Sequence, residues 1–118
     1  MMILYIDDDP ASIKLVAKVL GLMGHRIISA PNVRTGLSLA HREPPELILM
    51  DLHLPHINGL EGIYLLQNMP SLANIPIIGV TSQSDEDTMN AFLDLGCIAF
   101  VPKPIEPELL LEAIKRVG

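Results

Sequence analysis

The chain has 118 residues and a formal net charge of −6, and 49% of its residues are hydrophobic. This length is typical of one domain, so we expect a single domain over residues 1–118. The apolar composition excludes a disordered chain, and the acidic charge disfavours direct binding of nucleic acid, because an acidic surface repels phosphate. We expect no membrane association and a cytoplasmic location, because no signal peptide is recognisable and the one cysteine, Cys97, cannot form an internal disulfide.

Apolar stretches that suit buried strands alternate along the chain with stretches whose apolar residues recur at helical spacing. Residues 3–6 predict the first strand, and Asp9 followed by Pro10 predicts the start of a helix that Gly24 ends. The remaining elements follow in the order strand 26–29, helix from the cap Asn32 to about Arg42, strand 47–50, helix 60–69, strand 75–81, helix 85–95, strand 98–101 and a last helix opened by Pro107.

Five strands that alternate with five helices predict βαβ units and a parallel sheet. The strands show no polar alternation, which indicates that helices cover both faces of the sheet. Right-handed crossovers then give a doubly wound, three-layer (βα)5 α/β sandwich. Pro102 cannot donate to a strand ladder, so it places the fifth strand at an edge, as the flavodoxin-like order 2-1-3-4-5 requires.

Polar side chains follow the predicted strands at the points where these strands end. Asp7 and Asp8 follow the first strand, Asp51 follows the third, Thr81 ends the fourth, and Lys103 follows the fifth. In an open parallel sheet, ligands bind outside the carboxyl ends of the strands, at the switch point between the first and third strands. We therefore expect these five side chains to meet at one site.

Three carboxylates in one crevice repel one another and need compensating positive charge. Magnesium, a hard cation with oxygen ligands, can supply that charge together with Lys103, and no cluster of histidine and cysteine favours a softer metal. A carboxylate, a magnesium ion, a lysine and a hydroxyl suit phosphoryl transfer, in which negative charge spreads over oxygens. Asp51 is the best candidate nucleophile because it stands alone, whereas Asp7 and Asp8 form an adjacent, metal-holding pair.

Four sequence blocks stand at these strand ends: ILYIDDDP at residues 3–10, LILMDLHLP at 47–55 with NG at 58–59, IPIIGVT at 75–81, and GC followed by FVPKP within 96–104. With these blocks in this order and spacing, the chain resembles the receiver domains of two-component response regulators, in particular the single-domain chemotaxis type. The resemblance spans essentially the whole chain. It implies a phosphoacceptor regulatory domain and not an enzyme, with no output domain in this chain.

The resemblance implies that Asp51 is the phosphoacceptor, and that Asp8, Asp51 and the backbone carbonyl of His53 ligate magnesium. Asp7 is expected to act mainly through a bound water. His53 and Gln83 lie at positions that tune hydrolysis of the acyl phosphate in this family, so the lifetime of the phosphoryl group stays open.

The resemblance also implies roles for residues after the fourth and fifth strands. Thr81 and Lys103 are expected to contact the phosphoryl oxygens, and the small Ser82 to leave room for them. Pro104 implies a cis peptide bond that aims Lys103 into the crevice. Phe100 occupies the aromatic switch position, whose inward turn couples to Thr81 on phosphorylation; without a hydroxyl, it would switch by packing alone.

The partners implied by the resemblance are proteins. The phosphodonor is expected to be a sensor histidine kinase or a histidine phosphotransfer protein. The output is expected to be a changed surface on the fourth helix, fifth strand and fifth helix, read by a downstream protein target or a tethered effector. A phosphorylation-dependent homodimer through that face stays open, as does whether the chain acts alone or within a longer protein such as a hybrid kinase.

Two other functions fit part of the pattern. Asp7-x-Asp9 matches the first motif of haloacid dehalogenase-type phosphohydrolases, but Ala11 stands where that motif has Thr or Val, and there is no room for a cap domain. An interaction scaffold that is never phosphorylated would not need the retained acidic residues, Thr81 and Lys103. We therefore rank both below the phosphoacceptor switch.

Overall fold

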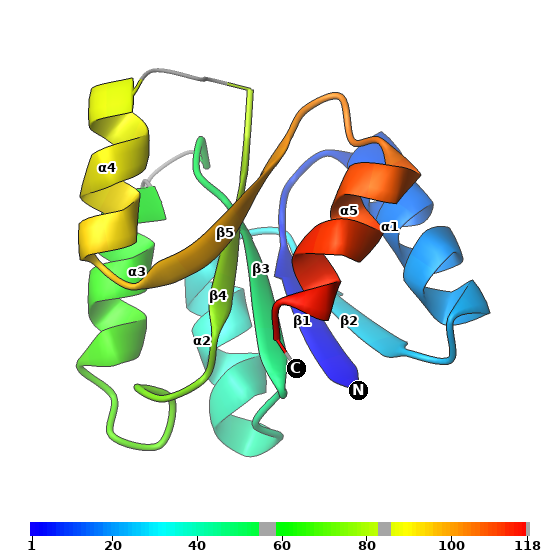
Figure 1. The fold of residues 1–118 in the computed structure, drawn as a ribbon. Coiled ribbons are helices and arrows are strands. Elements are labelled where there is room, and N and C mark those ends of the chain that lie inside the picture. Colours follow the sequence, from blue (N-terminus) through cyan, green and yellow to red (C-terminus); the bar gives the residue numbers. More distant parts are fainter. Residues whose placement is uncertain (55–58, 83–85, 118) are drawn as a thin grey trace.

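The computed structural model of the protein describes residues 1–54, 59–82 and 86–117. Strands and helices alternate along the chain, as predicted (Figure 1). The elements are β1 (Met2–Ile6), α1 (Pro10–Leu22), β2 (Arg26–Ala30), α2 (Val33–Arg42), β3 (Leu47–Asp51), α3 (Gly59–Gln67), β4 (Ile77–Thr81), α4 (Glu86–Asp94), β5 (Cys97–Pro102) and α5 (Pro107–Lys115). No helix in this described part combines the length and the apolar character that a bilayer span requires.

The strands form one parallel sheet in the order β2-β1-β3-β4-β5, which confirms the predicted order. β5 lies at an edge of the sheet, and Pro102 pairs with Thr81 at its last position, where a missing N–H is tolerated. The strand order reverses between β1 and β3. The switch point therefore lies between the loops that leave these two strands.

Helices cover both faces of the sheet, with α1 and α5 on one face and α2, α3 and α4 on the other (Figure 1). Successive side chains of a strand point to opposite faces. In β1, Ile3 and Tyr5 accordingly pack under α1 and α5, whereas Leu4 and Ile6 pack under the other three helices. All four are buried, and the arrangement is the predicted flavodoxin-like, three-layer sandwich.

Two element boundaries differ from the prediction by two residues, and a proline accounts for each; several others differ by one residue. α3 ends at Gln67 and not at residue 69, because Pro70 disfavours a helical conformation in the residue before it. β4 begins at Ile77 and not at residue 75, because Pro76 has no N–H to donate to a ladder. The predicted start of the fourth helix, Asp85, lies outside the described residues.

The predicted starts of the first two helices are confirmed. The side chain of Asp9 accepts a hydrogen bond from the backbone N–H of Ala11, and Asn32 accepts one from Thr35. Pro10 occupies the first turn of α1, where its missing N–H has no intrahelical partner to lose. Asp9 thus fixes the direction in which the chain leaves the carboxyl end of β1.

Candidate phosphoacceptor and metal site

The predicted acidic residues gather at the carboxyl end of the sheet, at its switch point. β1 and β3 are neighbours, with Ile6 paired with Met50, so the residues that follow them lie side by side. Asp7 and Asp8 directly follow β1, and Asp51 ends β3. Each of the three carboxylates offers one oxygen, and these oxygens lie within 4.8 Å of one another.

Asp7 is the most enclosed of the three acids, with 0% of its side chain exposed. Its Oδ1 accepts a hydrogen bond from the backbone N–H of Asp9 at 2.9 Å. Its Oδ2 accepts a hydrogen bond from the hydroxyl of Tyr5 and lies 2.9 Å from the ammonium of Lys103. A buried carboxylate needs such donors and a counter-charge. Asp7 is therefore a buried carboxylate whose position is fixed by its hydrogen bonds, and it is less accessible to a phosphodonor than an exposed acid would be.

Asp51 is also buried, but 5% of its side chain is exposed. Its Oδ1 accepts a hydrogen bond from the backbone N–H of His53 at 3.0 Å, and its Oδ2 lies 3.3 Å from the ammonium of Lys103. Burial is the largest influence and raises the pKa of Asp51; the His53 N–H lowers it, and the charge of Asp7 raises it further. Asp51 thus carries a negative charge that its surroundings only partly compensate.

Lys103 reaches the acidic cluster from the loop after β5. Its backbone N–H donates to the carbonyl of Thr81 at 2.8 Å, and its peptide bond to Pro104 is cis, as predicted. Burial lowers the pKa of Lys103, but the hydrogen bond to Asp7 and the charges of Asp51 and Asp7 outweigh burial, so the pKa is raised. Lys103 is therefore a positive charge fixed between two carboxylates, and its contact with phosphoryl oxygens stays a prediction.

Thr81 ends β4 beside this cluster and is buried. Its hydroxyl lies 3.0 Å from Nε2 of His53. The metal contact predicted for the carbonyl of His53 stays a prediction, as does the contact of Thr81 with a phosphoryl group. Ser82 is exposed next to Thr81, and Gln83 lies outside the described residues.

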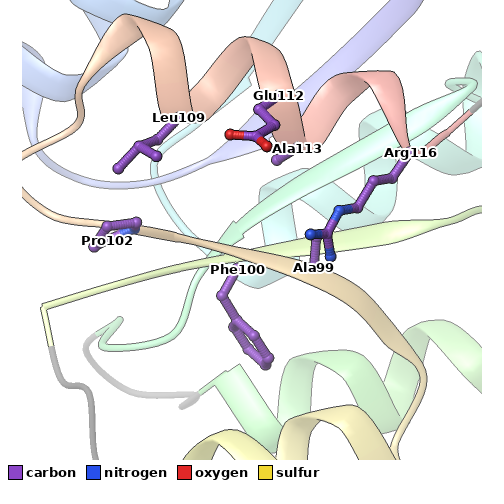
Figure 2. Close-up of a pocket in the computed structure, with 7 residues that line it drawn as sticks. All are labelled: Ala99, Phe100, Pro102, Leu109, Glu112, Ala113 and Arg116. Atoms are coloured by element: carbon purple, nitrogen blue, oxygen red, sulfur yellow. The ribbon is translucent and has the colours of Figure 1, made fainter.

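Phe100, the predicted switch residue, lies in β5 with its ring turned away from α5 (Figure 2). The ring contacts Phe92 of α4 edge-on, with centroids 6.3 Å apart and planes at 66°. It also lies over Gly79 of β4, where a Cβ would come within 2.9 Å of the ring. Between β5 and α5, a hollow of about 160 Å³ is lined by Ala99, Phe100, Pro102, Leu109, Glu112, Ala113 and Arg116.

The donor set of the acidic cluster fits magnesium. Mg²⁺ prefers oxygen, and a spacing within 4.8 Å is close to the ~4.2 Å that separates opposite ligands of an ion holding oxygens at about 2.1 Å. Among the described residues, these three carboxylates face one lysine, Lys103, which contacts Asp7 and Asp51, so negative charge is in excess. The next acid along the chain, Asp9, caps α1 and accepts from Ala11 and Ser12, so it is already engaged.

Two contacts in the site were not predicted from the sequence. Tyr5 lies in the apolar stretch predicted as the first strand. Its hydroxyl reaches Asp7 because residues two apart on a strand share a face, and this spacing is the signal that could have revealed the contact. Burial, followed by the hydrogen bond to Asp7, raises the pKa of Tyr5 and keeps the phenol protonated. The contact between the His53 side chain and Thr81 depends on a loop conformation that no periodicity predicts.

Comparison with known proteins finds a matching family model, related sequences and solved structures of the same fold. The sequence model of the family described as "Response regulator receiver domain" matches residues 3–115. Protein PilH of Pseudomonas aeruginosa is 31% identical over 115 residues, which cover 98% of this chain and 95% of PilH. The polar-differentiation response regulator DivK of Brucella anthropi is 32% identical, over 96% of this chain and 92% of DivK. The solved structure of chemotaxis protein CheY4 of Vibrio cholerae superposes with a TM-score of 0.93 at 23% identity, over 99% of this chain and 98% of CheY4, which shows the shared fold.

Proposed function

Because this chain belongs to the family of response regulator receiver domains, we propose that it is a phosphoacceptor switch of a two-component phosphorelay, in which Asp51 takes the phosphoryl group. The observation that carries the proposal is the position of Asp51 at the end of β3, next to two further carboxylates and 3.3 Å from the ammonium of Lys103. Residues 1–118 would form one receiver domain. Its output would depend on the state of this single site.

In the proposed transfer, a carboxylate oxygen of Asp51 attacks the phosphorus of a phosphohistidine on the donor protein. A P–O bond forms as the P–N bond breaks, and the donor imidazole leaves with the electron pair and takes up a proton. The product is an acyl phosphate on Asp51. The ammonium of Lys103 would neutralise charge on the phosphoryl oxygens, and the hydroxyl of Thr81 would donate to one of them.

Asp8, Asp51 and the backbone carbonyl of His53 would hold magnesium at this site, with Asp7 acting through a bound water. When bound, the ion supplies positive charge that stabilises the phosphoryl oxygens during transfer. The excess negative charge and the spacing of the carboxylate oxygens support this assignment.

The proposed output is a changed surface on α4, β5 and α5. The hydroxyl of Thr81 would have to leave His53, which it contacts at 3.0 Å, to reach a phosphoryl group on Asp51. That movement would change the packing beside Phe100, which is half-buried and rests on Phe92 of α4. A downstream protein target or a tethered effector would read the new surface, and a phosphorylation-dependent homodimer through the same face is a second form of output.

The phosphodonor would be a sensor histidine kinase or a histidine phosphotransfer protein. One relative, DivK, is named as a response regulator, which supports this class of partner. Because histidine kinases draw on ATP, the transfer would take place in the cytoplasm. The chain would act either alone or as the receiver of a longer protein.

The two alternatives have less support. A haloacid dehalogenase-type hydrolase would use Asp7 as its nucleophile, yet that side chain is fully enclosed and bonded to Tyr5 and Lys103. The second acid of its motif, Asp9, caps a helix. An interaction scaffold without phosphorylation has no use for the close approach of Lys103 to Asp51.

Incubation with acetyl phosphate and Mg²⁺, followed by intact-mass measurement, tests the proposal. We expect the wild type to gain the mass of one phosphoryl group and Asp51→Asn to gain none. Asp94→Asn, the same chemical change at the exposed end of α4, should keep the gain. A gain that persists in Asp51→Asn and disappears in Asp7→Asn would favour the hydrolase, and no gain with acetyl phosphate or a phosphohistidine donor would favour the scaffold.

A further inference from the structure

Tyr5 is a phenol placed in the middle of an aliphatic strand. It lies in β1 between Leu4 and Ile6, is 0% exposed, and packs among aliphatic side chains under α1 and α5. A buried hydroxyl is costly without a hydrogen-bond partner. Tyr5 meets this need by donating to Oδ2 of Asp7, two residues further on the same face of the strand.

Asp7 depends on this hydroxyl because its cationic partner, Lys103, is shared with Asp51. The ammonium of Lys103 lies 2.9 Å from Asp7 and 3.3 Å from Asp51, so it is divided between two carboxylates. The phenol of Tyr5 has one proton, and it donates that proton to Asp7. If Lys103 turned towards a phosphoryl group on Asp51, Asp7 would keep the hydroxyl of Tyr5 and the backbone N–H of Asp9.

We propose that Tyr5 is a positioning residue of the phosphoacceptor site: its hydroxyl holds the carboxylate of Asp7 in the orientation that completes magnesium binding with Asp8 and Asp51. The inference rests on the proposed function. Groups that hydrogen-bond to metal-binding carboxylates set the orientation of those carboxylates, and their loss typically weakens metal affinity by about 10-fold to 100-fold. Without the phenol, the carboxylate of Asp7 can rotate. Fixing its orientation when Mg²⁺ binds then costs free energy, which weakens the Mg²⁺ affinity.

Titration calorimetry of the unphosphorylated protein with MgCl₂ tests this inference. We expect Tyr5→Phe, which keeps the buried ring, to weaken Mg²⁺ binding by about 10-fold. Tyr64→Phe removes the same hydroxyl from a tyrosine that is 61% exposed in α3, and it should bind Mg²⁺ like the wild type. Equal affinity in Tyr5→Phe and the wild type, or no Mg²⁺ binding by the wild type, would overturn the inference.

A double-mutant cycle separates positioning from a general structural effect. If Tyr5 acts through Asp7, adding Tyr5→Phe to Asp7→Asn should change the Mg²⁺ affinity by less than twofold; a full additional loss would mean that Tyr5 acts elsewhere.

A second measurement, by NMR, needs no variant of Tyr5. The chain has two tyrosines, so carbon-13 labelling of the phenol carbon gives two signals, which Tyr64→Phe assigns. Saturating Mg²⁺ should shift the Tyr5 signal, and an unmoved Tyr5 signal would contradict the inference.

These readouts also separate the inference from the proposed function. A wild type whose Mg²⁺ affinity depends on Tyr5 and Asp7, but that never takes up a phosphoryl group, would refute the phosphoacceptor proposal while the positioning role stands. A wild type that is phosphorylated on Asp51, together with a Tyr5→Phe variant that binds Mg²⁺ normally, would refute the positioning role while the phosphoacceptor proposal stands.

Discussion

The charge on Asp51 is needed for the proposed chemistry and is costly to the folded chain. Its side chain is almost fully buried, and the Asp7 carboxylate lies close by. Burial raises the pKa of Asp51, with the charge of Asp7 adding to that effect and the His53 N–H opposing it. A raised pKa means that the folded state binds the proton more tightly than the unfolded state. The free energy of unfolding therefore falls as pH rises through the unfolded-state value of about 4 towards the folded one.

Asp51→Asn should accordingly stabilise the protein at neutral pH in the absence of Mg²⁺. We expect the free energy of unfolding to rise by about 1 kcal/mol, because the amide removes the buried charge and its oxygen can still accept the N–H of His53. Urea denaturation at pH 7 and at about pH 4 measures the effect. The gain should shrink at the lower pH, because a larger fraction of Asp51 is protonated there in the wild type. A gain that grows at the lower pH would show that charge is not the cause.

Lys103→Met should have the opposite effect on stability. The substitution leaves Asp7 and Asp51 buried without their shared cation, and removing one partner of a buried pair is strongly destabilising. We expect a loss of about 2 kcal/mol, below the range for fully enclosed pairs because Lys103 is 19% exposed. Lys115→Met, an exposed lysine in the last turn of α5, serves as the control in the same urea titration. Equal losses in the two variants would contradict the assigned role of Lys103.

At the scale of single residues, the sequence located the site because its groups occupy positions that a parallel sheet brings together. Asp7, Asp8, Asp51, Thr81 and Lys103 follow or end strands, and strand ends meet whatever the details of packing. Side-chain hydrogen bonds are different, because they depend on rotamers and loop paths. The bond from Tyr5 to Asp7 was therefore missed, as was the contact of His53 with Thr81.

At the scale of elements, the contact between β4 and β5 depends on a residue without a side chain. Gly79 of β4 leaves the space that the ring of Phe100 occupies; a Cβ there would lie 2.9 Å from Phe100 and 3.0 Å from Leu52. Phe100 in turn contacts Phe92 of α4. Gly79 thus links the strand that ends at Thr81 to the face proposed as output.

Gly79→Ala should push the Phe100 ring outward and cost about 1–3 kcal/mol of stability, the range for overpacking a core. In a Phe100→Ala background, much of that cost should disappear, because the main obstruction is gone. Gly21→Ala in α1 is the matched control: a Cβ there meets nothing within 4 Å, so helix propensity should give a gain of roughly 0.5–1 kcal/mol. Thermal and urea unfolding compare the wild type, the two single variants, the double variant and the Gly21→Ala control. An equal cost of Gly79→Ala in both backgrounds would show that the Phe100 ring is not the obstruction.

The types and order of the elements followed from the hydrophobic pattern, whereas the end of α3 and the start of β4 did not. The edge position of β5 was predicted from Pro102, because a residue without an N–H cannot donate to a neighbouring strand and is therefore typical of an edge. The ends of α3 and β4 were placed two residues too far out, although Pro70 and Pro76 lie there. Apolar residues next to those prolines extend the pattern beyond the point at which the backbone can continue the element.

At the scale of the whole molecule, a bound divalent ion should stabilise the fold. The acidic cluster adds to a net charge of −6, so Mg²⁺ relieves both local and overall repulsion. At ten times its dissociation constant, an ion that binds the folded state alone contributes about 1.4 kcal/mol, which raises Tm by several degrees in a chain of this size.

This stabilisation should depend on Asp8, which is exposed at the mouth of the cluster. We expect MgCl₂ to raise the Tm of the wild type well above the effect of NaCl at equal ionic strength, which accounts for screening. Asp8→Asn should lose this specific increase. An undiminished increase in Asp8→Asn, or an equal increase with NaCl, would mean that Mg²⁺ acts on the surface charge and not at the site.

The most direct test of Asp51 as the phosphoacceptor is to locate the phosphoryl group on the chain. Treatment with a phosphohistidine donor or acetyl phosphate in the presence of Mg²⁺, followed by borohydride reduction, converts an aspartyl phosphate into homoserine, which peptide mass spectrometry can assign to a position. We expect homoserine at position 51, and only after Mg²⁺-dependent phosphorylation. Homoserine at position 7 or 8, or an unmodified Asp51 in a protein that has gained phosphate, would contradict it.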